Sequence, residues 1–122
     1  MLKLLVVDDE RDICDFVKSF FEERDFEVIM AYDGREALKK TEEEDPDIIL
    51  LDIRMPVMDG MEALRELQGK NKKIIMITAI EDEEKAKEAK TCGAAEYITK
   101  PLMLEQLERT VLTVAEQIKM EG

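Results

Sequence analysis

Histidine and tryptophan are absent from this chain of 122 residues. Histidine is the side chain that most readily exchanges protons near neutral pH, and it is also the commonest protein ligand of metals. Its absence excludes histidine-based acid–base catalysis, histidine metal sites and an internal phosphohistidine relay. Any chemistry that this chain performs must therefore rely on its carboxylates, hydroxyls and amines.

Cysteine and long apolar segments are scarce as well. Cys14 and Cys92 have neither close spacing nor metal-ligand partners, so we expect two separate buried or half-buried thiols in a reducing compartment. No apolar run approaches the length of a membrane-spanning helix. The first apolar run begins within three residues of Met1, so we expect no signal peptide. These features predict a cytoplasmic location.

Basic residues are also few relative to acidic ones. Eighteen basic residues face 30 acidic ones, and the resulting net charge of −12 argues against binding to nucleic acid or to an anionic membrane surface. The hydrophobic content of 45%, with five glycines and three prolines, excludes disordered and fibrous classes. A chain of this length is expected to form one domain over residues 1–122, without an output domain.

Short apolar runs alternate with helical patterns five times along the chain. Unbroken apolar runs of this kind are typical of parallel strands that helices cover on both faces. The expected strands are Lys3–Val7, Glu27–Ala31, Asp47–Leu51, Lys73–Thr78 and Glu96–Thr99. Five such units predict a doubly wound α/β sheet. Right-handed crossovers reduce the number of topologies but leave the strand order open.

A helical pattern follows each expected strand. Asp33 with Glu36, and Asp59 with Glu62, have the spacing of a capping box and predict where the second and third helices begin. The fourth pattern, Glu81–Lys90, is short and rich in charge. The first helix is expected to face the core with Ile13, Phe16, Val17, Phe20 and Phe21, and the last with Leu104, Leu107, Val111, Val114, Ala115 and Ile118.

Reactive side chains stand where the apolar runs end. The first run ends in Asp8 and Asp9, the third in Asp52 and the fourth in Thr78, while the last strand leads into Lys100. The carboxyl ends of parallel strands meet at one edge of a sheet, where ligands of such folds bind. This placement predicts a metal and phosphate site. Mg²⁺ suits it, because this ion prefers oxygen ligands and commonly combines carboxylates with phosphate.

Each of these residues also has an ordinary structural explanation. One of the two adjacent aspartates could cap the first helix, Asp52 could make a turn, and Lys100 could be a solvated loop residue. A cap accounts for one aspartate better than for two. A third carboxylate at the same edge concentrates negative charge, which a cation or Lys100 would offset. Thr78 is a good strand residue in any case.

Four motifs, taken in order, resemble the receiver domain of response regulators in two-component signalling. They are Asp8-Asp9, then Asp52 with the loop Met55-Pro56-Val57-Met58-Asp59-Gly60, then Thr78-Ala79, and last Lys100-Pro101. The match covers essentially the whole chain. It implies a flavodoxin-like (CheY-like) fold with the strand order 2-1-3-4-5 and five helices.

The resemblance implies a role for each residue of the predicted site. Asp52 would accept a phosphoryl group from the phosphohistidine of a sensor kinase or phosphotransfer protein, in a reaction that needs Mg²⁺, with Mn²⁺ as a substitute. Lys100 would pair with Asp52 at rest and with the phosphoryl group afterwards. Asp9, Asp52 and the backbone carbonyl of Arg54 would hold the metal, and Asp8 would act through coordinated water.

The resemblance also implies a two-state switch. Thr78 would move toward the phosphoryl group and Tyr97 would fill the vacated space, although an aromatic residue at a sheet edge is the plainer explanation of Tyr97. The fourth helix, fifth strand and fifth helix would bind a downstream protein, and a phosphorylation-dependent homodimer is left open. The bond before Pro101 would be cis. Apart from its own phosphorylation and dephosphorylation, such a chain is not an enzyme.

Two positions that vary across the family carry Arg54 and Ile80. Neither side chain offers an acid or amide to position a water, so we expect slow self-dephosphorylation. Two rival functions stay open. One is a receiver-like binding module that is not phosphorylated, although every reactive position is present. The other is a magnesium-dependent phosphatase of the haloacid-dehalogenase type, but that class resembles a signature with an acid two residues after its nucleophilic aspartate, where this chain has Arg54.

Overall fold

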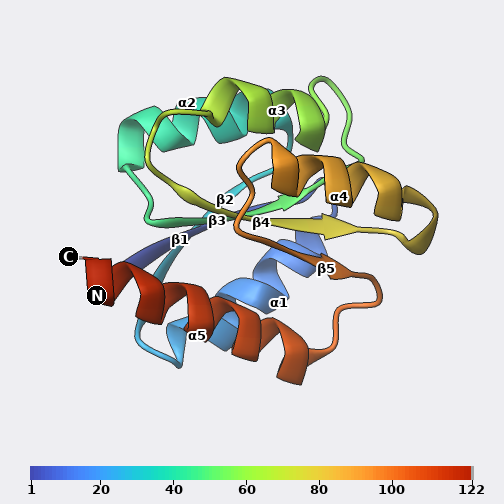
Figure 1. Ribbon diagram of the computed structural model, residues 1–122. Helices are drawn as coiled ribbons and strands as arrows, with labels where there is room; N and C mark the ends of the chain where they lie inside the picture. Colours follow the sequence, from blue (N-terminus) through green and yellow to red (C-terminus); the bar gives the residue numbers. More distant parts are fainter. Residues whose placement is uncertain (122) are drawn as a thin grey trace.

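The computed structural model describes residues 1–121, in which five strands alternate with five α-helices (Figure 1). The elements are β1 (Leu2–Val7), α1 (Arg11–Glu22), β2 (Phe26–Ala31), α2 (Gly34–Glu44), β3 (Ile48–Asp52), α3 (Gly60–Leu67), β4 (Lys73–Thr78), a 3₁₀ turn η1 (Ile80–Asp82), α4 (Glu83–Thr91), β5 (Glu96–Thr99) and α5 (Leu104–Glu121). The strands form one parallel sheet in the order β2-β1-β3-β4-β5. The expected fold class and strand order are confirmed.

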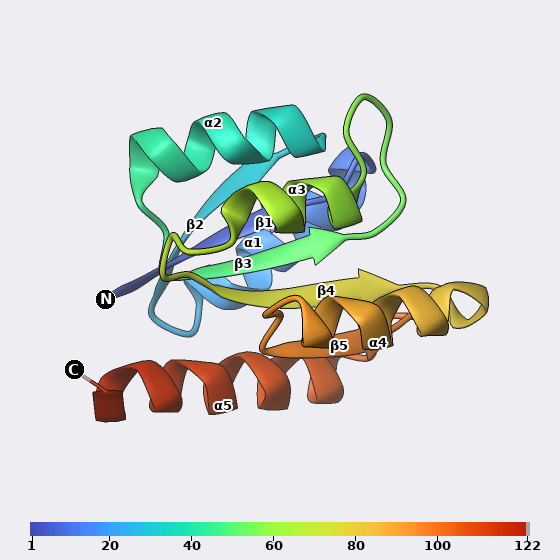
Figure 2. The same cartoon turned by 45° about the horizontal axis from the view of Figure 1, so that its top comes forward.

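The sheet is the middle of three layers. Helices α1 and α5 cover one face, and α2, α3 and α4 cover the other (Figures 1 and 2). Each face has its own apolar core, because alternate residues of a strand point to opposite sides. In β1, Leu4 and Val6 contribute to the core beneath α1 and α5, whereas Leu5 and Val7 contribute to the other. The central strands are therefore apolar on both faces, as their unbroken apolar runs predict.

Strand register brings the carboxyl ends of the central strands into line. Val7 of β1 lies opposite Leu51 of β3, so the residues that follow them, Asp8 and Asp52, emerge side by side. Thr78 ends β4 opposite Thr99, the last residue of β5, and Lys100 follows directly. The predicted functional residues therefore leave the sheet along a single edge.

Two of the helix starts follow the predicted capping boxes. The backbone N–H of Glu36 donates to the Asp33 carboxylate at 2.8 Å, and the Glu36 side chain accepts from the N–H of Tyr32 at 3.0 Å. At α3, the N–H of Glu62 donates to the Asp59 carboxylate at 3.0 Å. Both aspartates thus satisfy backbone donors that the first helical turn leaves without a partner.

Some expectations about the helices were wrong. Phe16 is 52% exposed, because α1 turns Cys14, Val17 and Phe21 toward the sheet and leaves Phe16 on the far side. The pattern over Glu81–Lys90 begins as the 3₁₀ turn η1 and becomes α-helical only at Glu83. Leu104, at the start of α5, is 38% exposed and does not belong to the core.

The two thiols are free, as expected, with Cys14 buried and Cys92 half-buried. None of the helices among residues 1–121 combines the length and the apolar character that crossing a bilayer requires.

Candidate functional site

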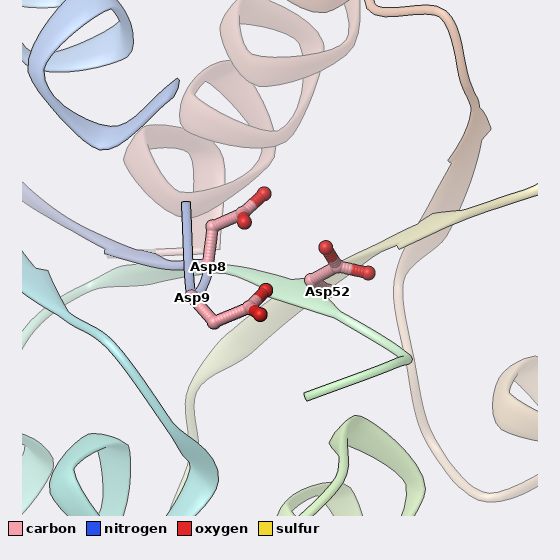
Figure 3. Close-up of side chains that lie close together, drawn as sticks. All are labelled: Asp8, Asp9 and Asp52. Atoms are coloured by element: carbon pink, nitrogen blue, oxygen red, sulfur yellow. The ribbon is translucent and has the colours of Figure 1, made fainter. Parts of the chain in front are cut away.

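Three carboxylates gather where β1 and β3 end (Figure 3). Asp8 and Asp9 follow β1, and Asp52 is the last residue of β3. One oxygen from each side chain lies within 4.8 Å of the others, while Asp8 and Asp52 are buried and Asp9 is exposed. The cluster thus has a buried floor and one side open to solvent, as a site that exchanges ions with water needs.

Neither Asp8 nor Asp9 caps α1. The N-cap residue is Glu10, and its side chain makes no capping hydrogen bond. Asp8 instead accepts a hydrogen bond from the N–H of Glu10 at 2.9 Å, within the turn that joins β1 to α1. Helix capping therefore does not explain this pair of aspartates, and their common feature is their approach to Asp52.

The clustering of acids is visible in the pKa of Asp8, which is raised to about 7. Burial is the largest cause, since it disfavours the charged form, and the neighbouring Asp52 raises the value further. The hydrogen bond from Glu10 and the charge of Lys100 act in the opposite direction. The cluster thus holds more negative charge than its surroundings stabilise, and a bound cation would relieve that excess.

Lys100 provides the one ammonium that contacts the cluster among residues 1–121. Its Nζ donates to Oδ2 of Asp52 at 2.8 Å. Burial opposes the charge on Lys100, but the hydrogen bond to Asp52 and the attraction of Asp52, Asp8 and Glu10 outweigh it, so the pKa of Lys100 is raised. Lys100 therefore stays protonated at neutral pH. The peptide bond between Lys100 and Pro101 is cis.

Thr78 and Tyr97 lie on the same face of neighbouring strands. Thr78 is buried opposite Thr99, and Tyr97 precedes Thr99 by two residues. Such diagonal neighbours are within reach of an aromatic side chain. The Thr78 hydroxyl donates to the carbonyl of Ala79 at 3.0 Å, and the Tyr97 hydroxyl donates to the carboxylate of Glu83 at 3.2 Å. Tyr97 therefore contacts the first turn of α4.

The loop between β3 and α3 is held at both ends. The N–H of Gly60 donates to the carbonyl of Ile53 at 2.7 Å, and the N–H of Gly34 donates to the carbonyl of Met58 at 3.0 Å. A Cβ on Gly60 would lie 2.2 Å from the carbonyl oxygen of Asp52, so only glycine permits this approach. The predicted loop residues Met55, Pro56, Asp59 and Gly60 thus belong to a closed turn beside Asp52.

Arg54 contributes to this loop in two ways. Its N–H donates to Oδ1 of Asp52 at 3.3 Å. Its side chain reaches Asp82 of η1, where Nη2 donates to Oδ1 at 2.9 Å and Nε donates to Oδ2. Asp82 is missing from the residues that the sequence singles out. It is separated from Arg54 by 28 residues, and the only local signal is an acid before a helix.

The three acids fit a magnesium ion by their chemistry. Mg²⁺ is commonly held by one or two carboxylates together with waters and phosphate oxygens. Asp9 and Asp52, with the carbonyl of Arg54, are the groups expected to hold it, and Asp8 is the neighbour expected to act through water. The cluster of Asp8, Asp9 and Asp52 supplies oxygen atoms only. It lacks the nitrogen and sulfur ligands that zinc or copper prefer.

Comparison with known proteins identifies the family. A family model described as "Response regulator receiver domain" matches residues 4–112. The chain is 42% identical over 116 residues to the chemotaxis protein CheY of Listeria monocytogenes, with 89% of this chain and 98% of that protein covered. It is 39% identical over 111 residues to the regulatory protein AtoC of Escherichia coli, and there it covers 89% of this chain but only 24% of AtoC.

Solved structures agree with the sequence relatives. A receiver domain protein from Clostridium thermocellum superposes with a TM-score of 0.93 and 29% identity, over the whole of both chains. The chemotaxis response regulator CheY4 of Vibrio cholerae superposes with a TM-score of 0.86 and 36% identity, over 93% of this chain and 98% of CheY4. These matches extend over the site as well as the sheet, and the chain belongs to the response regulator receiver domain family of two-component signalling.

Proposed function

We propose that Asp52 accepts a phosphoryl group from a phosphohistidine of a partner kinase or phosphotransfer protein, and that the modified chain regulates a downstream protein. One observation carries this proposal. The carboxylate of Asp52 lies within reach of two further carboxylates and 2.8 Å from the ammonium of Lys100. A phosphoryl acceptor needs this combination, because transfer depends on positioning and on neutralising the charge of the phosphoryl oxygens.

The transfer step uses few groups of this chain. An oxygen of Asp52 forms a bond to phosphorus while the phosphorus–nitrogen bond to the donor imidazole breaks, and the imidazole leaves with the electron pair. Lys100, which pairs with Asp52 before transfer, then pairs with a phosphoryl oxygen. No proton has to be removed from Asp52, because its carboxylate is already the nucleophile. This agrees with the absence of histidine from the chain.

Magnesium completes this site in the proposal. When bound, the ion neutralises charge on the phosphoryl oxygens. Asp9, Asp52 and the Arg54 carbonyl would hold it, and Asp8 would orient its water. Mn²⁺, which also accepts oxygen ligands, would substitute.

The signal would leave the site through Thr78, Tyr97 and the surface of α4, β5 and α5. Tyr97 lies on β5 two residues before Thr99, the partner of Thr78, and hydrogen-bonds to Glu83, so it would link the site to the first turn of α4. A downstream protein, or a second copy of the phosphorylated chain, would bind this surface. The chain covers only 24% of the length of AtoC, so the downstream partner of this chain is proposed here and is not taken from AtoC.

Incubation with a small acyl-phosphate donor and measurement of the intact mass tests the proposal. The wild type should gain one phosphoryl group with Mg²⁺ and none without it. Asp52→Asn should gain none, whereas Asp12→Asn, which removes an exposed acid outside the cluster, should react like the wild type. After the donor is removed, the label should be lost slowly, since Arg54 and Ile80 do not position water. A lifetime of seconds would contradict that expectation.

Other outcomes of this experiment, or of a separate assay with a phosphate ester, would favour a different assignment. A labelled Asp52→Asn protein would show that another residue is the acceptor. A wild type that takes up no phosphoryl group would favour the binding module. Continuous release of phosphate from a phosphate ester would favour the phosphatase.

A further inference from the structure

Asp82 is a buried aspartate at the start of α4 whose side chain does not cap the helix. Its exposed fraction is 4%, and it precedes α4 directly. Asp33 and Asp59 stand at the same position of α2 and α3, and both accept a capping hydrogen bond. Asp82 makes no such bond. Burial of a charged carboxylate is costly without a partner, so the partner of Asp82 should explain its place.

That partner is Arg54, on the loop that follows the phosphoacceptor strand. The guanidinium donates to both oxygens of Asp82, from Nε and from Nη2, in the two-bond arrangement that makes arginine–carboxylate pairs strong. The hydrogen bond to Arg54 lowers the pKa of Asp82, so this carboxylate stays ionised at neutral pH although burial opposes it. The Arg54 side chain is 65% exposed, so it can move without unpacking the core.

Arg54 therefore contacts the phosphorylation site with its main chain and the start of α4 with its side chain. Its N–H lies 3.3 Å from the carboxylate of Asp52. The loops that carry Arg54 and Asp82 both leave the sheet at the same edge, after β3 and β4 (Figure 2). Among residues 1–121, Arg54 alone donates hydrogen bonds both to Asp52 and to Asp82. A change of charge at Asp52 would therefore act close to Arg54.

Helix α4 has little else to hold its first turn. The buried residues within α4 are Ala86 and Ala89, which offer small apolar side chains. The hydrogen bond from Tyr97 to Glu83, at 3.2 Å, is the other side-chain hydrogen bond among residues 1–121 that joins this turn to a neighbouring element. Elements with few buried contacts open locally at low free energy, so one strong ion pair can decide the position of such a helix.

We propose that Arg54 and Asp82 form a latch that holds the start of α4 against the phosphoacceptor loop while Asp52 is unmodified, and that a phosphoryl group on Asp52 opens this latch by attracting the guanidinium. The opening step rests on the proposed function, whereas the latch does not. A phosphoryl group carries more negative charge than the carboxylate of Asp82 and offers arginine more acceptor oxygens. Loss of Arg54 leaves the Asp82 carboxylate without its ion-pair partner, and the start of α4 then loses its link to the phosphoacceptor loop.

Hydrogen–deuterium exchange of residues 83–86 tests the latch in the unmodified protein. Arg54→Gln removes the guanidinium and leaves Asp82 charged, whereas Asp82→Asn removes the charge of Asp82. An effect that both variants share would therefore come from the pair. Each variant should speed exchange of these amides about tenfold. The double variant should add little to either one, because both changes break the same interaction. Arg54→Lys, which keeps the charge but not the two-bond geometry, should lie between.

Glu84→Gln is the matched control. It removes one carboxylate from the same helical turn and breaks the exposed pair with Lys87, at 3.6 Å, without touching the loop. Its exchange should stay within about twofold of the wild type. If Arg54→Gln and Asp82→Asn exchange as slowly as Glu84→Gln, the latch is overturned.

A second arm adds Mg²⁺ and the acyl-phosphate donor and records intact mass in parallel. Phosphorylated wild type should exchange residues 83–86 as fast as unmodified Asp82→Asn, and phosphorylation of Asp82→Asn should change its exchange by less than about twofold. A labelled wild type with slow exchange would overturn the opening step. A wild type that gains no phosphoryl mass would overturn the proposed function and the opening step together, and the unmodified variants would still decide the latch.

Discussion

At the scale of single residues, backbone strain is concentrated at Val57. Its φ is +70°, in the left-handed region that β-branched residues rarely adopt. The N–H of Met58 donates to the carbonyl of Pro56 at 2.8 Å across this residue, which keeps the turn tight. The side chain is 72% exposed, so it gains little burial in return. The loop beside Asp52 therefore holds this conformation through its anchors at Gly34 and Gly60.

Val57→Gly should stabilise the protein. Strain of this kind costs on the order of 1–3 kcal/mol, and the extra freedom of glycine in the unfolded chain costs roughly 0.5–1 kcal/mol. We expect the free energy of unfolding, measured with urea, to rise by about 1 kcal/mol. Val57→Ala keeps a Cβ and should gain less than half of this amount. A Val57→Gly protein less stable than the wild type would show that the turn is not strained.

At the scale of secondary structure elements, one side chain joins α1 to α5. Arg24 follows α1, and its Nε donates to Glu108 of α5 at 2.6 Å. Its guanidinium also lies 3.6 Å from the centre of the Phe20 ring and donates to the carbonyl of Phe20 at 2.9 Å. Both charged partners are partly buried, so solvent screens this contact less than it screens the exposed pairs.

Arg24→Gln should lower the free energy of unfolding by about 1–2 kcal/mol, because it removes an ion pair and a cation–π contact together. Lys18→Gln, on α1, is the control. Its partner Glu22 lies at 3.9 Å one turn away, and both side chains are exposed, so the loss should stay below about 0.5 kcal/mol. Equal effects of the two substitutions in urea unfolding would mean that Arg24 contributes only as a surface charge.

Side-chain contacts between elements are the part of the fold that this sequence does not predict. The strands were predicted to within one residue because their apolar runs are local signals, and the two capping boxes are local as well. The pairs Arg24–Glu108 and Arg54–Asp82 join residues 84 and 28 positions apart, and no periodicity reports them. The position of Phe16 was wrong for a related reason, since three other residues of α1 already fill the space on the sheet.

The candidate site was predicted by the same local signals together with one rule of topology. Apolar runs locate the strand ends, and a parallel sheet brings those ends to one edge. Which strands are neighbours does not follow from the runs, and the approach of Asp8 to Asp52 depends on β1 lying beside β3. Asp82 was missed because its burial depends on a side chain from another loop.

At the scale of the whole molecule, negative charge is in excess and is also concentrated at one place. The net charge of −12 spreads over the surface, but Asp8, Asp9 and Asp52 lie within 4.8 Å of one another at the end of the sheet. Like charges at this separation repel, and Lys100 offsets only one of them. Folding therefore assembles a cluster whose repulsion a divalent cation would relieve. Binding that requires the folded cluster adds to the stability of the entire domain.

Magnesium should raise the free energy of unfolding at constant ionic strength, by about 2.7 kcal/mol at a concentration 100 times the dissociation constant. Asp9→Asn should lose most of this gain and, without Mg²⁺, should be at least as stable as the wild type, since one repelling charge is gone. Asp12→Asn lowers the net charge equally but leaves the cluster intact, so it should keep the full gain. Equal responses of Asp9→Asn and Asp12→Asn in thermal or urea unfolding would assign the effect to the net charge of −12 and not to the three carboxylates.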